Sequence, residues 1–497
     1  MQSHPSILGE EKAKRACGGR RALSLSVSVI LVVFIFLGSF AEKAGGMTIE
    51  EEKKIGKKVF LEIERSVEFV KDPTLQAFLN GMGRSLVAEV GATTFDFKFY
   101  LMRASEPNAF AIPGGTIFVT TGLVVLAENE HEVAGVLGHE IAHVVERHVA
   151  QMFERSKRLS MATVAAVIAG ILLGGGGKGS EAAATMAMAT SEALMLKYTR
   201  DNETDSDQNG LQYVIKAGYD PKGFITFLNK MSKESLTSAP KIPAYLSTHP
   251  LTENRIALLE NLVQISGKSG GPFRSLGNFR KIQMKAFVEE REAQASITQF
   301  QSLVDTQPQE AEAYYGLGLA YRKMGRLDKS TEVFQKGTTI APADPDLFNE
   351  LGIVYFESGK LDLAIETLEA AQSLARQRTD SYEDLSGVYY LGRGYQTKGD
   401  RAKALPLLLK VRSALPEFSD VHYHLGSLYG RTDQKGLSHF HFGKYFKLRG
   451  EMSTALTHFR KAAEFLEQGR PEREEVQREI KELAETKGPN SASTRRP

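Results

Sequence analysis

The sequence has a single cysteine, Cys17, among 497 residues. One cysteine excludes an intrachain disulfide, and it also excludes a zinc site built from several cysteine ligands. Histidine and carboxylate side chains are therefore the expected ligands of any metal. An excess of one charge is also lacking, since 62 Lys and Arg residues face 60 Asp and Glu residues. The net charge of +2 gives no support to a nucleic-acid partner, and none is expected.

Long apolar runs are nearly absent, and the one exception lies close to the N-terminus. Residues 1–21 contain five basic residues against two acidic ones, and the apolar segment Ala22–Ala41 follows. A basic segment before an apolar one is typical of a secretory signal, and this run is also nearly long enough to stay in the bilayer as an anchor. We expect residues 1–46 to be a signal peptide or an N-terminal membrane anchor, with the remaining polypeptide exported.

The remaining polypeptide divides into two halves with different patterns. Residues 47–265 alternate helical and strand-like segments, whereas residues 279–485 have helical periodicity throughout. Residues 266–278 are rich in Gly and Ser and suit a linker, and residues 486–497 form a polar tail that we expect to be disordered. The predicted fold class is mainly α with a small β-sheet in the first half, followed by an all-α second half.

An internal repeat runs through the second half. Leu-Gly pairs followed by a tyrosine recur with offsets of 34, 40 and 34 residues, and a weaker Phe-Gly copy follows them. The pairs are Leu317-Gly318, Leu351-Gly352, Leu391-Gly392, Leu425-Gly426 and Phe442-Gly443. This pattern resembles the tetratricopeptide repeat, in which paired helices stack into a solenoid. Such solenoids generally bind proteins or peptides, so we expect the repeats to bind protein.

The strongest chemical motif is His139-Glu140-Ile141-Ala142-His143, within a helix expected over Val133–Met152. Two histidines four positions apart share one helix face, so both imidazoles can reach one zinc ion. Glu140 lies beside that position and can accept a proton from water. The alternative is a pair of surface histidines, but the flanking residues are apolar, which disfavours an unpartnered glutamate there.

A hydrolytic zinc site needs a third protein ligand. Residues 198–207 are densely acidic and lead into an apolar stretch, which predicts the start of a helix. Glu203 and Asp207 are four positions apart and share a face. By spacing alone, these acids equally suit a helix N-terminus stabilised by the helix dipole, so the third ligand stays open at this point.

Four segments of the first half carry a more specific pattern: 108–122, 137–148, 200–207 and 248–256. Together with the repeats, they resemble the HtpX-type and prenyl-protein-type zinc endopeptidases, and in particular the BepA-type periplasmic subgroup with C-terminal tetratricopeptide repeats. The resemblance implies a zincin-like α+β fold and one Zn²⁺ per molecule held by His139, His143 and Glu203. It also implies Asp207 as the partner of a zinc histidine. Asp205-Ser206 replaces the family's usual Glu-Ala, which leaves Glu203 and Asp207 intact.

Substrate binding and charge stabilisation are expected from three further places. Gly115 to Val119 is β-rich after a Pro-Gly-Gly turn, as in the family's edge strand, although an ordinary core strand also fits. An exposed edge would bind an extended peptide. The expected substrate-binding residues are Gly114, Gly115, Thr116, Ile117 and Phe118. His249 and Arg255 are expected to be catalytic, as groups that stabilise a developing oxyanion, and His249 can alternatively occupy the open zinc position.

The resulting prediction is an exported zinc metalloendopeptidase that hydrolyses misfolded or stalled envelope proteins in the periplasm. The resemblance implies the outer-membrane assembly machinery as the partner of the repeats. The alternative is a periplasmic chaperone or adaptor whose zinc site is closed by His249, and a membrane-embedded peptidase is a third interpretation. Within residues 161–195, Met161 to Leu173 is apolar, Gly174 to Gly177 follow, and Ala182 to Met195 is rich in Ala and Met. This stretch suits a lid, a substrate groove, a membrane contact or a buried hairpin.

Overall fold

The computed structural model describes residues 47–155, 198–237, 243–267, 273–275, 277–378 and 384–485. The apolar segment Ala22–Ala41, residues 161–195 and the tail from residue 486 lie outside these residues, so the predictions for them stay predictions. Among the helices of the described ranges, none is long and apolar enough to cross a membrane.

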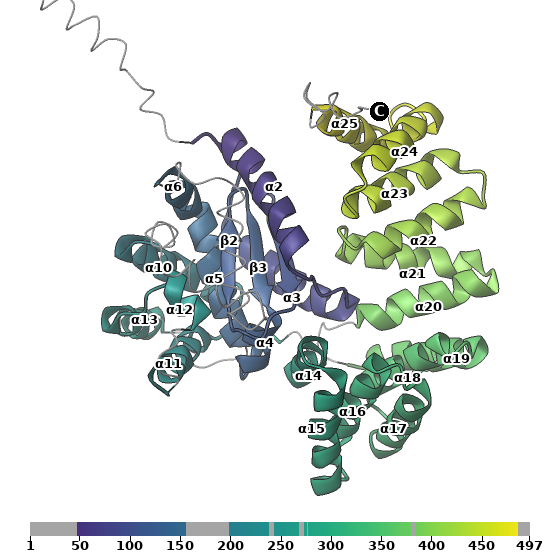
Figure 1. The fold of residues 1–497 in the computed structure, drawn as a ribbon, viewed down its shortest axis with the longest axis horizontal. Coiled ribbons are helices and arrows are strands. Elements are labelled where there is room, and N and C mark those ends of the chain that lie inside the picture. Colours follow the sequence, from purple (N-terminus) through teal and green to yellow (C-terminus); the bar gives the residue numbers. More distant parts are fainter. Residues whose placement is uncertain are drawn as a thin grey trace, which may run out of the picture. The chain divides into compact units, whose positions relative to one another are not determined.

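The first half combines a small sheet with several helices (Figure 1). Its elements are α2 (Ile49–Ser66), α3 (Pro73–Val87), β1 (Lys98–Met102), β2 (Ala109–Ile112), β3 (Thr116–Thr120), α4 (Thr121–Leu126), α5 (Glu130–Val145), α6 (His148–Arg155), α10 (Arg200–Lys216), α11 (Lys222–Thr237), α12 (Ala244–Thr248) and α13 (Glu253–Ser266).

The sheet of the first half has the strand order β1–β3–β2. β3 pairs with β1 in parallel and with β2 in antiparallel orientation, and Gly114 and Gly115 form the β2–β3 turn with positive φ angles of 89° and 96°. The prediction that Gly115 to Val119 is an edge strand is therefore wrong. Because β3 is hydrogen-bonded on both sides, its backbone at Thr116, Ile117 and Phe118 is not open to an added peptide strand.

The helix predicted over Val133–Met152 is interrupted. α5 ends at Val145, and α6 begins at His148. Between them, Arg147 adopts a left-handed conformation with φ 57°, and its Nε donates to the buried carboxylate of Glu52 in α2 at 3.0 Å. This ion pair joins the break in the helix to a residue far away in the sequence, which hydrophobic periodicity cannot predict.

The second half is helical throughout the described residues, as predicted, and its helices form antiparallel pairs (Figure 1). They are α14 (Phe279–Glu290), α15 (Ala293–Thr306), α16 (Ala311–Lys323), α17 (Leu327–Ile340), α18 (Pro345–Glu357), α19 (Leu361–Ala375), α20 (Leu385–Lys398), α21 (Arg401–Ala414), α22 (Ser419–Gly430), α23 (Lys435–Leu448), α24 (Met452–Phe465) and α25 (Pro471–Glu485).

The repeat glycines explain how the helix pairs pack. A Cβ atom on each would lie within 3.2 Å of a side chain sixteen positions later, in the next helix. The contacts join Gly318 to Phe334, Gly352 to Leu368, Gly392 to Leu408, Gly426 to Phe442 and Gly443 to Phe459. The weaker fifth copy therefore makes the same contact as the other four. The glycine is needed because the neighbouring side chain fills the space of its missing Cβ.

Replacing Gly318 with alanine should destabilise the repeats by about 1–3 kcal/mol, because the new Cβ would lie 2.6 Å from the Phe334 ring. Gly81 in α3 is the matched control, since nothing lies within 4 Å of its Cβ position. Gly81→Ala should instead stabilise its helix by about 0.5–1 kcal/mol. Thermal unfolding followed by circular dichroism measures both. Equal shifts for the two variants would contradict this account of the repeat glycines.

Buried histidines make the stability of the repeats depend on pH. Burial lowers the pKa of His422 to about 4. Its Nε2 donates to the Pro416 carbonyl at 3.0 Å, and its Nδ1 lies 3.0 Å from Nδ1 of His441, so one of these two facing nitrogens must be unprotonated. Between pH 6.5 and 4, the unfolded protein binds a proton that the folded protein does not, so the free energy of unfolding falls as the pH falls.

The expected loss is on the order of 3 kcal/mol at pH 4 for a fully buried histidine. Urea unfolding at pH 7 and pH 5, with chelator present at both so that metal binding does not contribute, measures the effect. His422→Gln should flatten the dependence. A free energy of unfolding that is equal at the two pH values would contradict the prediction.

Several polar contacts join the first half to the repeats. The Thr74 hydroxyl at the start of α3 hydrogen-bonds to the Asp384 carboxylate and, at 2.8 Å, to the Ser386 hydroxyl. Lys98 in β1 pairs with Glu417 at 2.8 Å. These contacts are formed by residues outside the connecting segment 266–278. The two halves are therefore in contact at α3 and α20.

Candidate metal centre

Helix α5 places His139, Glu140 and His143 in the interior, and all three side chains are fully buried. Asn129 caps this helix, since its side chain accepts the backbone N–H of Glu132 at 3.2 Å. Close packing fixes the position of the helix. A Cβ on Gly138 would lie 2.8 Å from the backbone of α10, so a larger residue would separate the helix that carries the histidines from the helix that carries Glu203.

Four side chains from three segments converge: His139 and His143 from α5, Glu203 from α10 and His249 directly after α12. One ligand atom from each lies within 4.8 Å of all the others. Nε2 of His139 is 3.0 Å from Nε2 of His143 and 3.3 Å from Nδ1 of His249, which in turn is 3.1 Å from Glu203 Oε1. Three imidazoles and one carboxylate suit tetrahedral zinc.

The tautomer of His139 directs a lone pair into this group. Its Nδ1 lies 3.0 Å from Oδ1 of Asp207, so the proton is favoured on Nδ1 and Nε2 is left as an acceptor. Nε2 of His143 and Nδ1 of His249 face Oε1 of Glu203 at 3.4 and 3.1 Å. A bound cation would satisfy such converging nitrogen lone pairs and carboxylate oxygen, so these residues fit a metal ion.

Electrostatics also distinguishes His143 from the Glu203 carboxylate. Burial lowers the pKa of His143 well below its ordinary value, which keeps the ring neutral, as a ligand must be. Burial by itself would raise the pKa of Glu203, but the charge of His249 and hydrogen bonds from the three histidines hold it well below its usual range. Glu203 is therefore ionised, as a metal-binding carboxylate must be.

The Glu140 side chain lies next to the four converging side chains but is not one of them. Its carboxyl is completely buried, and its Oε1 lies 3.3 Å from Nε2 of His249. Burial raises its pKa to about 7, with the charge of His249 acting in the opposite direction. A carboxyl group with a pKa near neutrality can both take up and release a proton, which suits a general base.

Arg255 in α13 lies beside the carboxylates rather than beside an open space. Its Nε and one terminal nitrogen bind Asp207 at 2.7 Å each, and the other terminal nitrogen lies 2.6 Å from Glu203 and 3.1 Å from the Pro250 carbonyl. Burial would lower the pKa of Arg255, but these carboxylates raise it, so the guanidinium stays charged. In this arrangement, Arg255 orients the Asp207 and Glu203 carboxylates. The predicted contact between Arg255 and an oxyanion stays a prediction, and it would require guanidinium N–H groups to leave their present acceptors.

Two aromatic residues at the group were missed by the sequence analysis. The Tyr198 ring stacks on His143 with a centroid distance of 3.8 Å, and the Tyr245 ring stacks on His249 at 4.7 Å. The Tyr245 hydroxyl is buried without a hydrogen-bond partner. The only local signal was their spacing, because Tyr198 directly precedes the cap of α10 and Tyr245 lies one turn before His249.

The substrate-binding segment predicted at Gly114–Phe118 is not at the open edge of the sheet. Within the described strands, the edge on the α5 side is β2 (Ala109–Ile112), and the backbone N–H of Ala111 is among the groups that lower the pKa of Glu140. Of the two outer strands of the described sheet, β2 is therefore the one that packs against α5, and its residues are buried.

Models of known protein families match parts of both halves of the protein. The model of peptidase family M48 matches residues 73–263. Tetratricopeptide-repeat models match residues 318–359 and 345–378. These ranges include the four converging side chains, the end of α16 and the whole of α17, α18 and α19.

Curated relatives share this similarity over less than half of this protein. The beta-barrel assembly-enhancing protease of Escherichia coli K12 is 29% identical over 43% of this sequence and 44% of the relative. A putative beta-barrel assembly-enhancing protease of Vibrio cholerae is 32% identical over 42% and 43%, respectively. The mitochondrial metalloendopeptidase OMA1 of Schizosaccharomyces pombe is 26% identical over 43% and 61%. The match thus spans less than half the length of both bacterial relatives. The protein has a peptidase M48 domain followed by C-terminal tetratricopeptide repeats.

Proposed function

We propose that the protein is a zinc metalloendopeptidase. The observation that carries this proposal is the convergence of His139, His143 and Glu203 beside a buried Glu140. Zinc bound there would supply a Lewis acid that polarises a peptide carbonyl and makes water more acidic. Peptidase names among the relatives and the M48 match support the same activity.

The protein's own residues have distinct roles in this proposal. Glu140 takes the proton from the attacking water and passes it to the leaving amine, for which a pKa of about 7 is suited. Asp207 holds the His139 ring through Nδ1, and Arg255 holds Asp207 and Glu203. An extended peptide would add to the side of β2 that no described strand occupies, and it would be bound with little dependence on its sequence.

Where the protein acts is a further part of the proposal. The names of the bacterial relatives refer to β-barrel assembly. With the signal-like segment Ala22–Ala41, they support an exported periplasmic enzyme that cuts misfolded or stalled envelope proteins, tethered to the inner membrane if that segment stays uncleaved. The repeats would bind a protein of the outer-membrane assembly machinery.

One observation favours a second candidate, an adaptor or chaperone with a closed zinc site. His249 contributes Nδ1 to the same group as the three proposed ligands. With His249 as a fourth ligand, no position would be left for water and the site would be structural. The His249→Ala variant distinguishes the enzyme from the adaptor. If His249 blocks an otherwise catalytic site, this variant should cleave protein faster than the unaltered protein does.

Digestion of casein, or of an unfolded outer-membrane protein, by the metal-loaded protein tests the main proposal. We expect chelator-sensitive cleavage and about one zinc per molecule by elemental analysis. Zinc binding without cleavage by either the unaltered protein or His249→Ala would favour the adaptor.

A further inference from the structure

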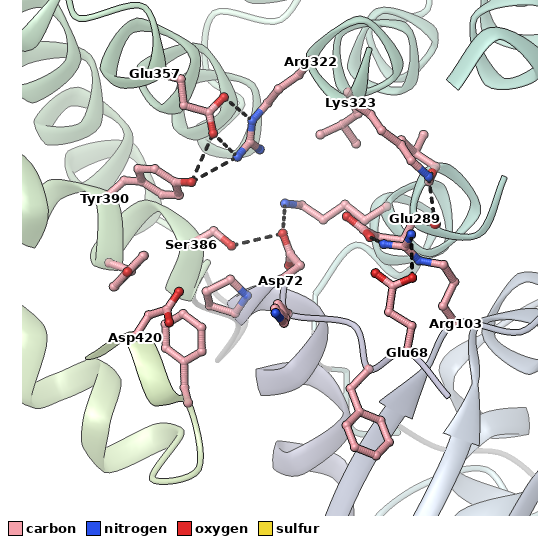
Figure 2. A pocket seen from close by; sticks show the side chains of 18 of the residues that line it. Glu68, Asp72, Arg103, Glu289, Arg322, Lys323, Glu357, Ser386, Tyr390 and Asp420 are labelled. Carbon is pink, nitrogen blue, oxygen red and sulfur yellow. Dashed lines mark hydrogen bonds and ion pairs between the residues drawn. The ribbon is translucent and has the colours of Figure 1, made fainter. Parts of the chain in front are cut away.

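A pocket of about 440 Å³ lies where the repeats meet the first half of the protein (Figure 2). It is bordered by α14, α16, α18 and α20 on one side and by the segments before α3 and after β1 on the other. α20 presents one face to it, with Ser386, Tyr389, Tyr390 and Arg393 at helical spacing. Side chains at this spacing lie on one stripe of the helix, so α20 forms a continuous wall.

Three of the six cations that line the pocket are paired with acids of the protein itself. Arg322 binds Glu357 through two hydrogen bonds of 2.9 and 2.8 Å, and Figure 2 shows this fork beside Tyr390. Arg103 pairs with Glu68 at 3.2 Å and Glu289 at 2.9 Å. The charges of these guanidinium groups are therefore already compensated by protein carboxylates.

The two lysines that face the pocket from the repeats are also occupied. Lys285 binds the carboxylates of Glu350 and Asp72. Lys323 donates to three backbone carbonyls at the end of α14, those of Val288, Glu289 and Arg291. All three donors of Lys323 are therefore used, and the charge of Lys285 is compensated by two carboxylates.

Arg393 differs from these four cations. Within the described part of the protein, it forms no ion pair with a carboxylate, and its Nε is buried without a hydrogen-bond partner. Its guanidinium carbon lies 4.7 Å from the Phe356 ring centroid, 5.4 Å from that of Tyr389 and 5.1 Å from that of Tyr390. The rings stabilise the cation but do not neutralise its charge.

A carboxylate is the anion that fits this position best. Its two oxygens match the planar guanidinium fork. Glu357, Glu289 and Asp420 also line the pocket, and their charges disfavour a dianionic phosphate more than a single carboxylate. Phe69 and Phe418 add aromatic surface, which suits a side chain next to the bound carboxylate.

We propose that this pocket binds a peptide through one carboxylate held by Arg393. The carboxylate belongs either to an acidic side chain or to the C-terminus of the peptide, since both present the same two oxygens. This proposal rests on the protein-binding role proposed for the repeats, and it specifies the chemical group that they recognise. It does not depend on whether the metal centre hydrolyses peptides.

Fluorescence anisotropy with labelled peptides tests the proposal on the full-length protein with the Glu140→Gln substitution, which prevents cleavage. Three peptides share the sequence Ser-Gly-Phe-Xaa-Phe-Gly-Ser. The first has Glu at Xaa and an amidated end, the second has Gln and a free carboxylate, and the third has Gln and an amidated end. We expect at least one charged peptide to bind about tenfold or more tightly than the neutral one. The tighter of the two charged peptides identifies the carboxylate source.

Arg393→Gln should reduce the affinity of the charged peptide to that of the neutral one. Arg431→Gln is the matched control, because Arg431 is exposed at the end of α22 and does not line the pocket. Arg393→Lys keeps the charge without the fork and should bind with intermediate affinity, which allows the test even if the glutamine variant fails to fold.

Two results would overturn the inference. One is equal binding of all three peptides, which would leave peptide binding by the repeats intact but would remove the role of the carboxylate. The other is unchanged affinity of the charged peptide for a folded Arg393→Gln or Arg393→Lys variant. Absence of binding by all three peptides at millimolar concentration would also count against it.

Discussion

Replacing Glu140 with glutamine is expected to lower the rate of peptide cleavage at least about a hundredfold while zinc stays bound. Glutamine keeps the size and the hydrogen-bonding reach of glutamate but cannot accept a proton near neutral pH. The Glu140 carboxyl is fully buried and lies beside His249 outside the four converging ligand atoms, so the change removes no proposed ligand. Removing a buried ionisable group should also leave the fold intact.

The measurement is the rate of casein cleavage together with the zinc content of the same sample. Glu128→Gln is the matched control, because the Glu128 side chain is 74% exposed just before the same helix and should leave both values unchanged. Chelator-sensitive cleavage at the unaltered rate by Glu140→Gln would show that this helix does not provide the base. The adaptor proposal would then be favoured.

Glu203→Ala is expected to abolish stable zinc binding. Its carboxylate is the only acidic member of the four-residue group, and the charge of His249 with the histidine hydrogen bonds keeps it ionised despite its burial. Loss of this charge removes one ligand and the main counter-charge for the cation. Zinc content after dialysis against a weak chelator should fall from about one per molecule to near zero, and cleavage should be lost with it.

Asp207→Asn is expected to weaken zinc binding less than Glu203→Ala does. Asp207 contacts the far side of the His139 ring and binds Arg255, so its replacement should weaken zinc about 10–100-fold without abolishing binding. Circular dichroism of both variants separates loss of metal from loss of fold. Full zinc occupancy in a folded Glu203→Ala variant would remove Glu203 from the proposed ligand set.

Much of the architecture could be predicted from local patterns. The start of a helix within residues 198–207 and the helical second half both follow from short-range spacing, and the structure confirms them. Helical periodicity repeats every few residues, so a single sequence contains the information. The boundaries of the five predicted segments stay a prediction, since several of them lie outside the described residues.

Other features depended on partners far away in the sequence. The edge-strand prediction failed because β1, more than ten residues before β3, pairs with its second side. The predicted long helix breaks where Arg147 reaches Glu52, 95 positions earlier. Tyr198 and Tyr245 were missed because their spacing was the only local signal, and it does not specify that their rings stack on His143 and His249.

The sequence alone determined the histidine pair and the repeat glycines, because both follow from the geometry of one helix or of two consecutive helices. Only the tertiary structure decided which other groups meet them. It brings Nδ1 of His249 to the His139 and Glu203 side chains, and it directs Arg255 onto two carboxylates. It also surrounds Arg393 with aromatic rings and gives it no ion pair among the described residues. Such contacts depend on how separate helices pack, and spacing within one segment cannot specify that packing.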